Sequence, residues 1–369
     1  MGFSTFTLEL SVTTRCNLGC SYCYVANRDV FMTPEIFDKK FPEVLDLMER
    51  AGAKYLNVSF FGGEPLLNWE LITHVTKKLR TEYKDVIKGL VLISNLTLID
   101  EEKVKFLKEW GVGVSWSFDG ITSNESRPLL PVFENKNKDG ELYENIMEMY
   151  ADKIHLIREL TQGCKVMIWP GNVSQMVENY KFFIEMGMPN PDFSLVRDDV
   201  WTKEDLILFH SEIKKLADEN IKNIKNGIWT IVGFFRLHIL DAVVNHLHGK
   251  RSFSCFAGHH GAVLTPNGDF YPCARFASKD FMKIDDDFSF EYWSDKLDPR
   301  KFDKCKECDL YQVCNTGCTY SQIRNDNKPL DSVCELFHMI EEQTQRIVRE
   351  LKDNDLFAKI VDQMFRSMG

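Results

Sequence analysis

Between residues 5 and 226 the chain alternates six times between a strand pattern and a helix pattern, and this alternation restricts its fold more than any other feature. Strands are predicted at 5–10, 55–61, 90–94, 113–118, 165–169 and 193–196, and helices at 33–52, 69–83, 100–111, 142–160, 174–186 and 203–226. Six βα units predict an α/β fold with a parallel sheet and helices packed outside it. In such folds active-site groups collect on the loops after the carboxyl ends of the strands.

Two stretches depart from this alternation. A long loop is predicted at 121–140, because it holds two prolines and a polar run at 134–140. From about Arg251 the chain is rich in Cys, Gly, Asp and Lys, and helical periodicity returns from Glu335. We therefore predict a barrel domain at 1–250, a small cysteine-rich domain at 251–340 and a C-terminal helix at 341–369.

The net charge of −10 excludes several classes of partner. No block of basic residues is present, so neither nucleic-acid binding nor a polybasic membrane anchor is expected. No apolar run approaches the length of a membrane span, and the first ten residues lack the pattern of a secretory signal. We expect a cytoplasmic protein.

The eleven cysteines fall into two groups. Three lie at positions 16, 20 and 23, seven lie between positions 255 and 334, and Cys164 stands alone. Thiols in the cytoplasm are kept reduced, so such groups favour metal binding over disulfides. Cys164 is expected to be a buried small hydrophobic residue before the fifth strand.

The first group has the spacing C-x₃-C-x₂-C, directly after the first strand. Three thiolates can hold three irons of a [4Fe–4S] cluster and leave the fourth iron open, whereas zinc needs a fourth ligand and the first histidine is His74. With Tyr22 before the last cysteine, the motif resembles that of the radical S-adenosylmethionine (SAM) superfamily. The resemblance implies Cys16, Cys20 and Cys23 as cluster ligands at the catalytic centre, and Tyr22 in the cofactor site.

The loop after the second strand carries a second motif of that family, GGEP. Its members here are Gly62, Gly63, Glu64 and Pro65. Glycine removes a Cβ and lets a ligand approach the backbone, whose oxygens can accept from an ammonium group. Alone the motif could be an ordinary turn; after the second strand, the resemblance implies contact with the methionine end of SAM.

The loops after the third and fourth strands resemble the family less closely. Ser94-Asn95-Leu96 departs from the family's threonine-asparagine-glycine at its first and third positions, and only Asn95 is retained. Ser117 and Asp119 match the family's S-x-D-G pattern, which implies that both lie near the SAM ribose.

The second group of cysteines resembles the seven-cysteine SPASM extension of the superfamily. By that resemblance Cys305, Cys308, Cys314 and Cys334 hold an outer auxiliary [4Fe–4S] cluster, and Cys255, Cys273 and Cys318 hold an inner one. The alternative is a pair of structural zinc ribbons, since C-x₂-C occurs in both. Two auxiliary clusters and the SAM cluster make three.

The inner cluster has three cysteines for four irons. Where sulfatase-maturing members of the family supply an eighth cysteine, this chain has the run 256–261, which includes His259 and His260. Three options stay open: an open iron, a histidine ligand, or a thiolate from the substrate. An open iron holding a substrate cysteine would lead to thioether formation.

The resemblance implies the reaction type. A reduced cluster gives one electron to SAM, and the resulting 5′-deoxyadenosyl radical abstracts an unactivated hydrogen; the protein supplies orientation and dryness. SPASM members mature peptides and proteins, installing thioether or carbon–carbon crosslinks or oxidising a sulfatase Cys or Ser to formylglycine. Sulfatase maturases carry an acidic residue after the second SPASM cysteine, but here Ala274 and then Arg275 follow. This favours peptide crosslinking over sulfatase maturation.

Two further alternatives and the expected partners complete this interpretation. A small-molecule SPASM dehydrogenase stays open, and a non-enzymatic iron–sulfur electron carrier is disfavoured because it needs neither GGEP nor a barrel. The expected partners are a peptide or protein substrate and a reductant such as flavodoxin or ferredoxin. Since the first strand begins near the first residue, leader recognition, where it is required, is expected to use a separate protein or the barrel and tail surfaces. Trp116, Trp169 and Trp201 are expected to be core, with the lining of a peptide groove at the strand ends as the alternative. Arg127, Arg197 and Arg275 are expected to pair with carboxylates of SAM, of the substrate or of the surface.

Three clusters predict about twelve irons and twelve sulfides per chain after anaerobic reconstitution. Replacing Cys16, Cys20 and Cys23 together by Ala should remove about four irons and all SAM cleavage, and Cys164→Ala should remove none. Iron and sulfide assays with a 5′-deoxyadenosine assay check both. SAM cleavage by the triple variant would show that the cluster is assigned to the wrong cysteines.

Overall fold

The computed structural model describes residues 4–137, 139–198, 200–248, 255–277, 282–285, 289–290, 302–311, 314, 317–326 and 328–366. The chain forms two compact units, each made of several segments. Unit 1 comprises Met1–Ser117, Ser123–Gln162 and Phe256–Leu297, and unit 2 comprises Phe118–Thr122, Gly163–Cys255 and Asp298–Gly369. The domain boundary predicted near residue 250 lies outside the described residues, and that division stays a prediction.

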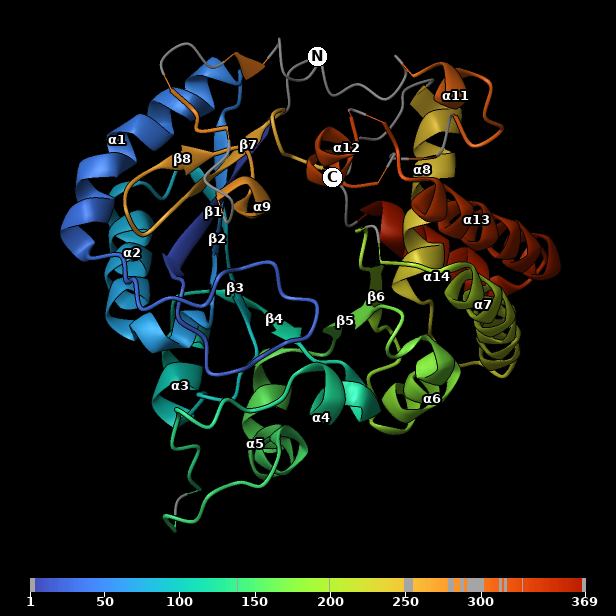
Figure 1. Cartoon of the computed structure of the whole chain (residues 1–369), viewed down its shortest axis with the longest axis horizontal. Helices are drawn as coiled ribbons and strands as arrows, with labels where there is room; N and C mark the ends of the chain where they lie inside the picture. The colour runs from blue at the N-terminus through green and yellow to red at the C-terminus, as the bar shows by residue number, and fades with distance from the viewer. Residues whose placement is uncertain are drawn as a thin grey trace. The chain divides into compact units, whose positions relative to one another are not determined.

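The sheet of unit 1 has the strand order β4-β3-β2-β1-β7-β8. Its strands are β1 (Thr5–Thr13), β2 (Tyr55–Gly62), β3 (Ile87–Ser94), β4 (Gly113–Ser117), β7 (Gly261–Leu264) and β8 (Phe270–Tyr271). The pairs are parallel except for β7 with β8. Its helices are α1 (Pro34–Arg50), the short η1 (Pro65–Asn68), α2 (Trp69–Glu82), α3 (Glu101–Glu109), α4 (Ser123–Ser126), α5 (Ile146–Leu160) and α9 (Ala274–Ala277). Figure 1 shows α1 and α2 running side by side along the β1–β2 part of this sheet.

The two faces of this sheet differ in burial. On β1 the side chains of Phe6, Leu8 and Leu10 are completely buried, whereas those at 5, 7 and 9 are half-buried. The same alternation recurs on β2, in register with β1. Complete burial of each large apolar side chain contributes about 1.5–3 kcal/mol, so the fully buried face supplies most of the apolar stabilisation of the sheet.

Predicted capping residues decide where several helices begin. The hydroxyl of Thr33 accepts from the Ile36 amide (3.3 Å), and Thr202 and Asp205 form a reciprocal capping box. The helix expected from residue 142 begins at Ile146, because the Asn145 side chain accepts from the Met147 amide at 3.0 Å.

Unit 2 contains one parallel strand pair, β5 (Cys164–Ile168) with β6 (Asp192–Leu195). Its helices are η2 (Gly120–Thr122), η3 (Val173–Gln175), α6 (Met176–Glu185), α7 (Lys203–Lys225), α8 (Gly233–His248), α11 (Asp303–Lys306), α12 (Thr319–Arg324), α13 (Asp331–Leu351) and α14 (Asp355–Arg366). Helix α13 packs on α7 and α8, where the buried His238 and Glu341 approach to 2.7 Å. Helix α8 was not predicted, because its apolar residues surround the helix and leave little periodicity.

Three boundaries differ from those predicted. The loop at 121–140 begins with η2 and α4. The C-terminal helix expected at 341–369 is two helices, of which the first starts at Asp331 and ends at Leu351. Asn354 separates them: its side chain accepts from the Phe357 amide (2.9 Å) and its carbonyl from the Ala358 amide (3.0 Å), which starts α14.

The six predicted strands are all present, four in unit 1 and two in unit 2, and the α/β fold class is confirmed. Among the described residues, none of the helices combines the length and the apolar character that crossing a bilayer requires.

Candidate functional site

The loop that follows β1 brings Cys16, Cys20 and Cys23 together. The Cys16 amide donates to the Asn27 side chain (3.1 Å), which donates in turn to the Cys16 carbonyl (3.0 Å). The Cys23 amide donates to the Cys20 carbonyl at 3.1 Å. Burial raises the pKa of the Cys16 thiol to about 12, and the nearby carboxylate of Glu64 adds to the effect. Iron binding at this loop must therefore displace protons.

A second segment, residues 126–130, is hydrogen-bonded to the cysteine loop. The Gly19 amide donates to the Pro128 carbonyl (2.9 Å), and the Ser21 amide donates to the Ser126 carbonyl (3.0 Å). Arg127 in this segment is buried, with its guanidinium 5.5 Å from the ring centre of Tyr22 and Nη1 3.9 Å from the Cys20 sulfur. A buried cation here favours the thiolate form of the cysteines.

The glycine pair of GGEP is required by close contact with the cysteine loop. A Cβ on Gly62 would lie 2.1 Å from the Thr13 carbonyl oxygen, and a Cβ on Gly63 would lie 2.1 Å from the Arg15 carbonyl oxygen. The Gly63 amide donates to the Thr13 carbonyl and the Glu64 amide to the Arg15 carbonyl, both at 2.8 Å. The two glycines therefore let the end of β2 bind the backbone that leads into Cys16.

The carboxylate of Glu64 connects the loops after β2 and β3. It is buried and accepts from the Ser94 hydroxyl (2.7 Å) and from the amides of Leu66 (3.0 Å) and Asn95 (2.9 Å). Burial raises the pKa of this carboxyl to about 7, although the three donors lower it. Its side chain thus acts inside the protein, as a brace between loops.

Asn95 continues this network to the cysteine loop. Its side chain donates to Asn17 Oδ1 (3.0 Å) and accepts from the Thr97 hydroxyl (2.7 Å), while Asn17 donates back to Thr97 (2.8 Å). All three are buried. The sequence argument missed Asn17, although its place beside Cys16 is a usable signal.

Leu96 adopts a left-handed backbone conformation with φ 57° while its side chain is completely buried. For an L-residue other than glycine this conformation costs about 1–2 kcal/mol. In the family's threonine-asparagine-glycine motif this third position is glycine, and this chain has leucine there.

The two residues of the S-x-D-G pattern lie in different surroundings. Ser117 ends β4 and is half-buried. Asp119 is completely buried in unit 2, where its carboxylate accepts from the Met167 amide (2.9 Å) and its carbonyl accepts from the Asn179 side chain (2.8 Å). The expectation that both lie near the SAM ribose stays a prediction.

The four outer cysteines surround one cavity of unit 2, of about 360 Å³. They are Cys305, Cys308, Cys314 and Cys334, and they line it together with Leu310, Val333 and Phe337. Cys334 lies in the first turn of α13, and burial raises the pKa of its thiol. His338 Nε2 lies 3.6 Å from the Cys308 sulfur. Four thiols around one apolar cavity have the donor chemistry that a [4Fe–4S] cluster needs.

The inner cysteines are divided between the units: Cys273 belongs to unit 1, and Cys255 and Cys318 belong to unit 2. Their common cluster stays a prediction. His259 is buried, and burial lowers the pKa of His260 to about 4, so His260 is neutral at pH 7. The three options for the fourth ligand stay open.

The remaining expectations concern isolated side chains. Cys164, Trp116 and Trp201 are buried, as predicted, whereas Trp169 is half-buried, so its placement in the core was wrong. The guanidinium of Arg197 lies 5.3 Å from the Phe337 ring centre, and that of Arg275 lies 4.8 Å from the Tyr24 ring centre. Both arginines therefore make cation–π contacts within their own units.

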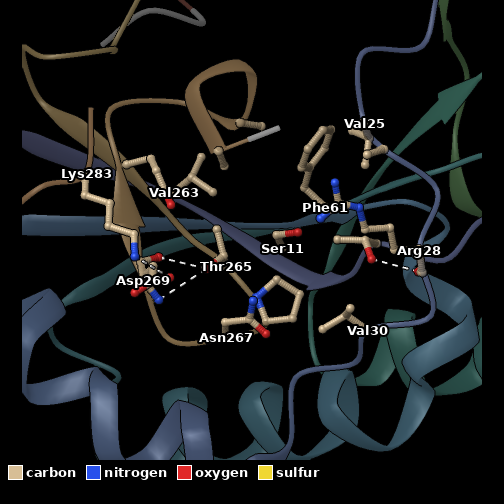
Figure 2. Close-up of a pocket in the computed structure, with 16 residues that line it drawn as sticks. Ser11, Val25, Arg28, Val30, Phe61, Val263, Thr265, Asn267, Asp269 and Lys283 are labelled. Carbon is tan, nitrogen blue, oxygen red and sulfur yellow. Dashed lines mark hydrogen bonds and ion pairs between the residues drawn. The ribbon is translucent and has the colours of Figure 1, made fainter. Parts of the chain in front are cut away.

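A cavity of about 250 Å³ opens in unit 1 between the β1–β2 ends, the segment 25–30 and the β7–β8 hairpin. Figure 2 shows Ser11 on its wall between Val263 and Phe61. At the hairpin end Lys283 and Asp269 form an ion pair at 3.1 Å.

Comparison with known families and curated proteins identifies relatives. The model of the Radical SAM superfamily matches residues 10–188. The radical SAM cyclopropyl synthase TigE of Paramaledivibacter caminithermalis is 31% identical over 96% of this chain and 76% of its own length. The cysteine-type anaerobic sulfatase-maturating enzyme of Clostridium novyi is 23% identical over 88% of this chain and 91% of its own length.

Solved structures show the same fold. Native anSMEcpe with bound AdoMet has a TM-score of 0.70 and 21% identity, and the match covers 94% of this chain and 99% of that chain. Streptococcus suis SuiB bound to the precursor peptide SuiA has a TM-score of 0.56 and 18% identity, over 89% of this chain and 75% of that chain.

Glu64→Gln tests the brace between the loops. A glutamine accepts hydrogen bonds through one atom where the carboxylate uses two, so we expect the variant to lose about 1–3 kcal/mol of stability, with weaker SAM binding. The pKa of Glu64 in the folded protein, about 7, lies above its ordinary value of 4.5. The stability of wild type relative to the variant is therefore greatest below about pH 4.5 and falls as the pH rises through 7. Denaturant unfolding under anaerobic conditions at several pH values measures these stabilities. The control is Glu49→Gln, a change at an exposed position of α1. If Glu64→Gln and Glu49→Gln have the same stability at every pH, Glu64 does not connect the two loops.

Leu96 offers a second test, because Ala and Gly remove the same leucine contacts. Gly is normally less stable than Ala by about 0.5–1 kcal/mol, but a left-handed backbone reverses the order. We expect Leu96→Gly to be more stable than Leu96→Ala by about 1 kcal/mol in denaturant unfolding. At Leu92, which is buried in β3, the normal order should hold. If the Ala variant is more stable than the Gly variant at both Leu96 and Leu92, the backbone of Leu96 is not strained.

Proposed function

The chain belongs to the radical SAM superfamily, and we propose that it is a maturase that takes a hydrogen atom from a peptide or protein substrate and installs a new bond there. The observation that carries this proposal is the 31% identity with TigE along almost the whole chain, together with the cysteine loop and its braces. We also retain the division into a barrel domain at 1–250 and a cysteine-rich domain from 251 as part of the proposal, with the C-terminal helical part beginning at α13 instead of at 341.

The residues of the first site fit the cofactors of the family. A [4Fe–4S] cluster with SAM supplies, when bound, the 5′-deoxyadenosyl radical that removes an unactivated hydrogen. Cys16, Cys20 and Cys23 would hold the cluster. Gly62 and Gly63 let the end of β2 pack directly against the backbone of the cysteine loop, where a Cβ would collide with it.

The other residues of this site hold its loops in place. Glu64 fixes the β2 loop to the β3 loop, and Asn95 and Asn17 extend the connection to the cysteine motif. Arg127 places a buried positive charge beside Cys20 and Tyr22. These contacts keep the site rigid, which favours a single orientation of a reactive group.

We propose two auxiliary clusters besides the SAM cluster. The cavity of about 360 Å³ lined by Cys305, Cys308, Cys314 and Cys334 supports the outer one. The inner one, on Cys255, Cys273 and Cys318, rests on the SPASM resemblance of the sequence. A flavodoxin or ferredoxin would supply electrons to the enzyme, and the auxiliary clusters would take part in accepting the electron that the substrate loses.

The relatives support a peptide substrate and indicate the kind of bond. Structures of anSMEcpe and SuiB contain bound peptides, and TigE is named a cyclopropyl synthase. A cyclopropane ring contains only carbon–carbon bonds, so the relative with the higher identity favours a carbon–carbon bond over a thioether. Leader recognition would use a separate protein or the surface of this chain.

Sulfatase maturation is the second candidate. The Clostridium novyi relative supports it at 23% identity. The residue after Cys273 disfavours it, since Ala274 has no side chain that can accept a proton.

The test uses anaerobically reconstituted protein with SAM and dithionite. Deuterated peptides encoded by short reading frames beside the gene are compared with the Cp18Cys peptide that occupies an anSMEcpe structure. We expect deuterium transfer into 5′-deoxyadenosine and a product lighter by two hydrogen atoms with free thiols. A trapped aldehyde on Cp18Cys would instead establish sulfatase-type maturation, and absence of 5′-deoxyadenosine would refute the proposal.

Ser117→Ala tests the expected SAM contact at the end of β4. Losing one hydrogen bond costs about 1 kcal/mol, so SAM affinity should fall several-fold while the iron content is retained. Equilibrium dialysis with labelled SAM measures it, and Ser115→Ala, two residues earlier on β4, is the matched control. Equal affinities for wild type and Ser117→Ala would remove Ser117 from the site.

A further inference from the structure

Among the residues that the structure describes in the strands of unit 1, Glu9 is the only acidic one. In the sheet it lies beside Ser59 of β2 and Val263 of β7. The alternation of β1 places it on the half-buried face, away from the completely buried Leu8 and Leu10. A carboxylate therefore lies on the half-buried face of β1, between β2 and β7.

The Glu9 carboxylate has one backbone partner. The Ala274 amide, at the start of α9, donates a hydrogen bond to it. Burial nonetheless raises the pKa of Glu9 from 4.5 to about 7, because this single donor does not offset the lost hydration. Such a carboxyl takes up and releases a proton at neutral pH, as a general base must.

The charged and titratable groups around Glu9 come from two other elements. Tyr24 lies within electrostatic range of Glu9, Cys273 and Arg275, and its ring stacks on Phe61 at 6.4 Å. The Arg275 guanidinium lies 4.8 Å from the Tyr24 ring centre. The described residues of β2 and β7 add no charge near Glu9.

The surroundings of Glu9 also line the cavity of unit 1. Ala274, which donates to Glu9, Val263, which lies beside it, and Ser11, two residues further along β1, are all on the cavity wall. Figure 2 shows Ser11 and Val263 there. Glu9 itself is not on the wall, but three of its neighbours are, so its carboxylate lies next to the cavity and a substrate residue held there would be close to it.

We propose that Glu9 is a catalytic residue that accepts the proton lost by the substrate after hydrogen-atom abstraction. This inference rests on the proposed function and adds the residue that completes its proton balance. The substrate loses one hydrogen atom to the 5′-deoxyadenosyl radical, one proton to the Glu9 carboxylate and one electron to an oxidised iron–sulfur cluster. The new bond forms at the carbon from which the hydrogen atom was taken, and Glu9 ends as the neutral acid.

Glu9→Gln separates this role from a structural one. The glutamine oxygen can still accept from the Ala274 amide, so α9 stays attached to β1, but the side chain cannot take up a proton. Glu9→Asp keeps a base at shorter reach, and Glu49→Gln on the exposed side of α1 is the matched control.

The first measurement uses the deuterated peptide that transfers its label in the test of the proposed function. Glu9→Gln should still pass deuterium to 5′-deoxyadenosine, yet form final product about 100-fold more slowly or not at all. Wild-type product formation should rise with pH through about 7 as the carboxyl ionises, and Glu9→Asp should recover part of it. Product formation by Glu9→Gln at the wild-type rate would overturn the proposal.

The second measurement needs no peptide. Infrared titration of the reconstituted protein should show carboxylic-acid absorption from Glu9 and Glu64 that disappears with midpoints near pH 7, because the pKa of both carboxyls is raised to about 7. Glu9→Gln should lose one of the two contributions, Glu64→Gln should lose the other, and Glu49→Gln should lose neither. Absorption as strong in Glu9→Gln as in wild type, or none that titrates near pH 7 in wild type, would overturn the role of Glu9. A lack of 5′-deoxyadenosine in every variant would instead refute the proposed function, so the two failures are distinguishable.

Discussion

The organisation of unit 1 depends on the contact between the end of β2 and the backbone that leads into the cysteine loop. Two adjacent glycines allow it, because any Cβ at Gly62 or Gly63 would collide with the carbonyls of Thr13 and Arg15. The buried carboxylate of Glu64 then ties this junction to the loop after β3. Three strand ends are thereby held in one arrangement by buried polar groups, each of which is costly to leave unpaired.

The same constraint explains the unusual residues next to it. Leu96 keeps a strained left-handed backbone although its side chain is buried, and Asn95 and Asn17 use their amides within the protein. Polar groups of this kind usually contact solvent or ligand. Here they position the cysteine loop, which leaves the thiols of that loop for a metal and the neighbouring backbone for a ligand.

Much of the molecule follows from the pattern of residues. The six strands, the caps at Thr33 and Thr202 and the burial of Cys164 were all predicted, because period-two and period-3.6 patterns and capping chemistry act over a few residues. Helix α8 was not, since an apolar helix has little periodicity. The break between α13 and α14 was also missed, although Asn354 carried the signal.

The sequence by itself determined the fold class, the family and the two groups of cysteines, since motif spacing and periodicity are local properties of the chain. Only the tertiary structure decided what surrounds them: the Glu64 carboxylate turned inward, the outer cysteines gathered around one cavity, and Glu9 hydrogen-bonded to an amide 265 residues later. At position 274 the sequence has alanine where the sulfatase maturases have an acidic residue. In the folded chain, β1 places the carboxylate of Glu9 beside the amide of Ala274. Burial and pairing between distant segments set the pKa of such a group, and neither is a local property of the chain.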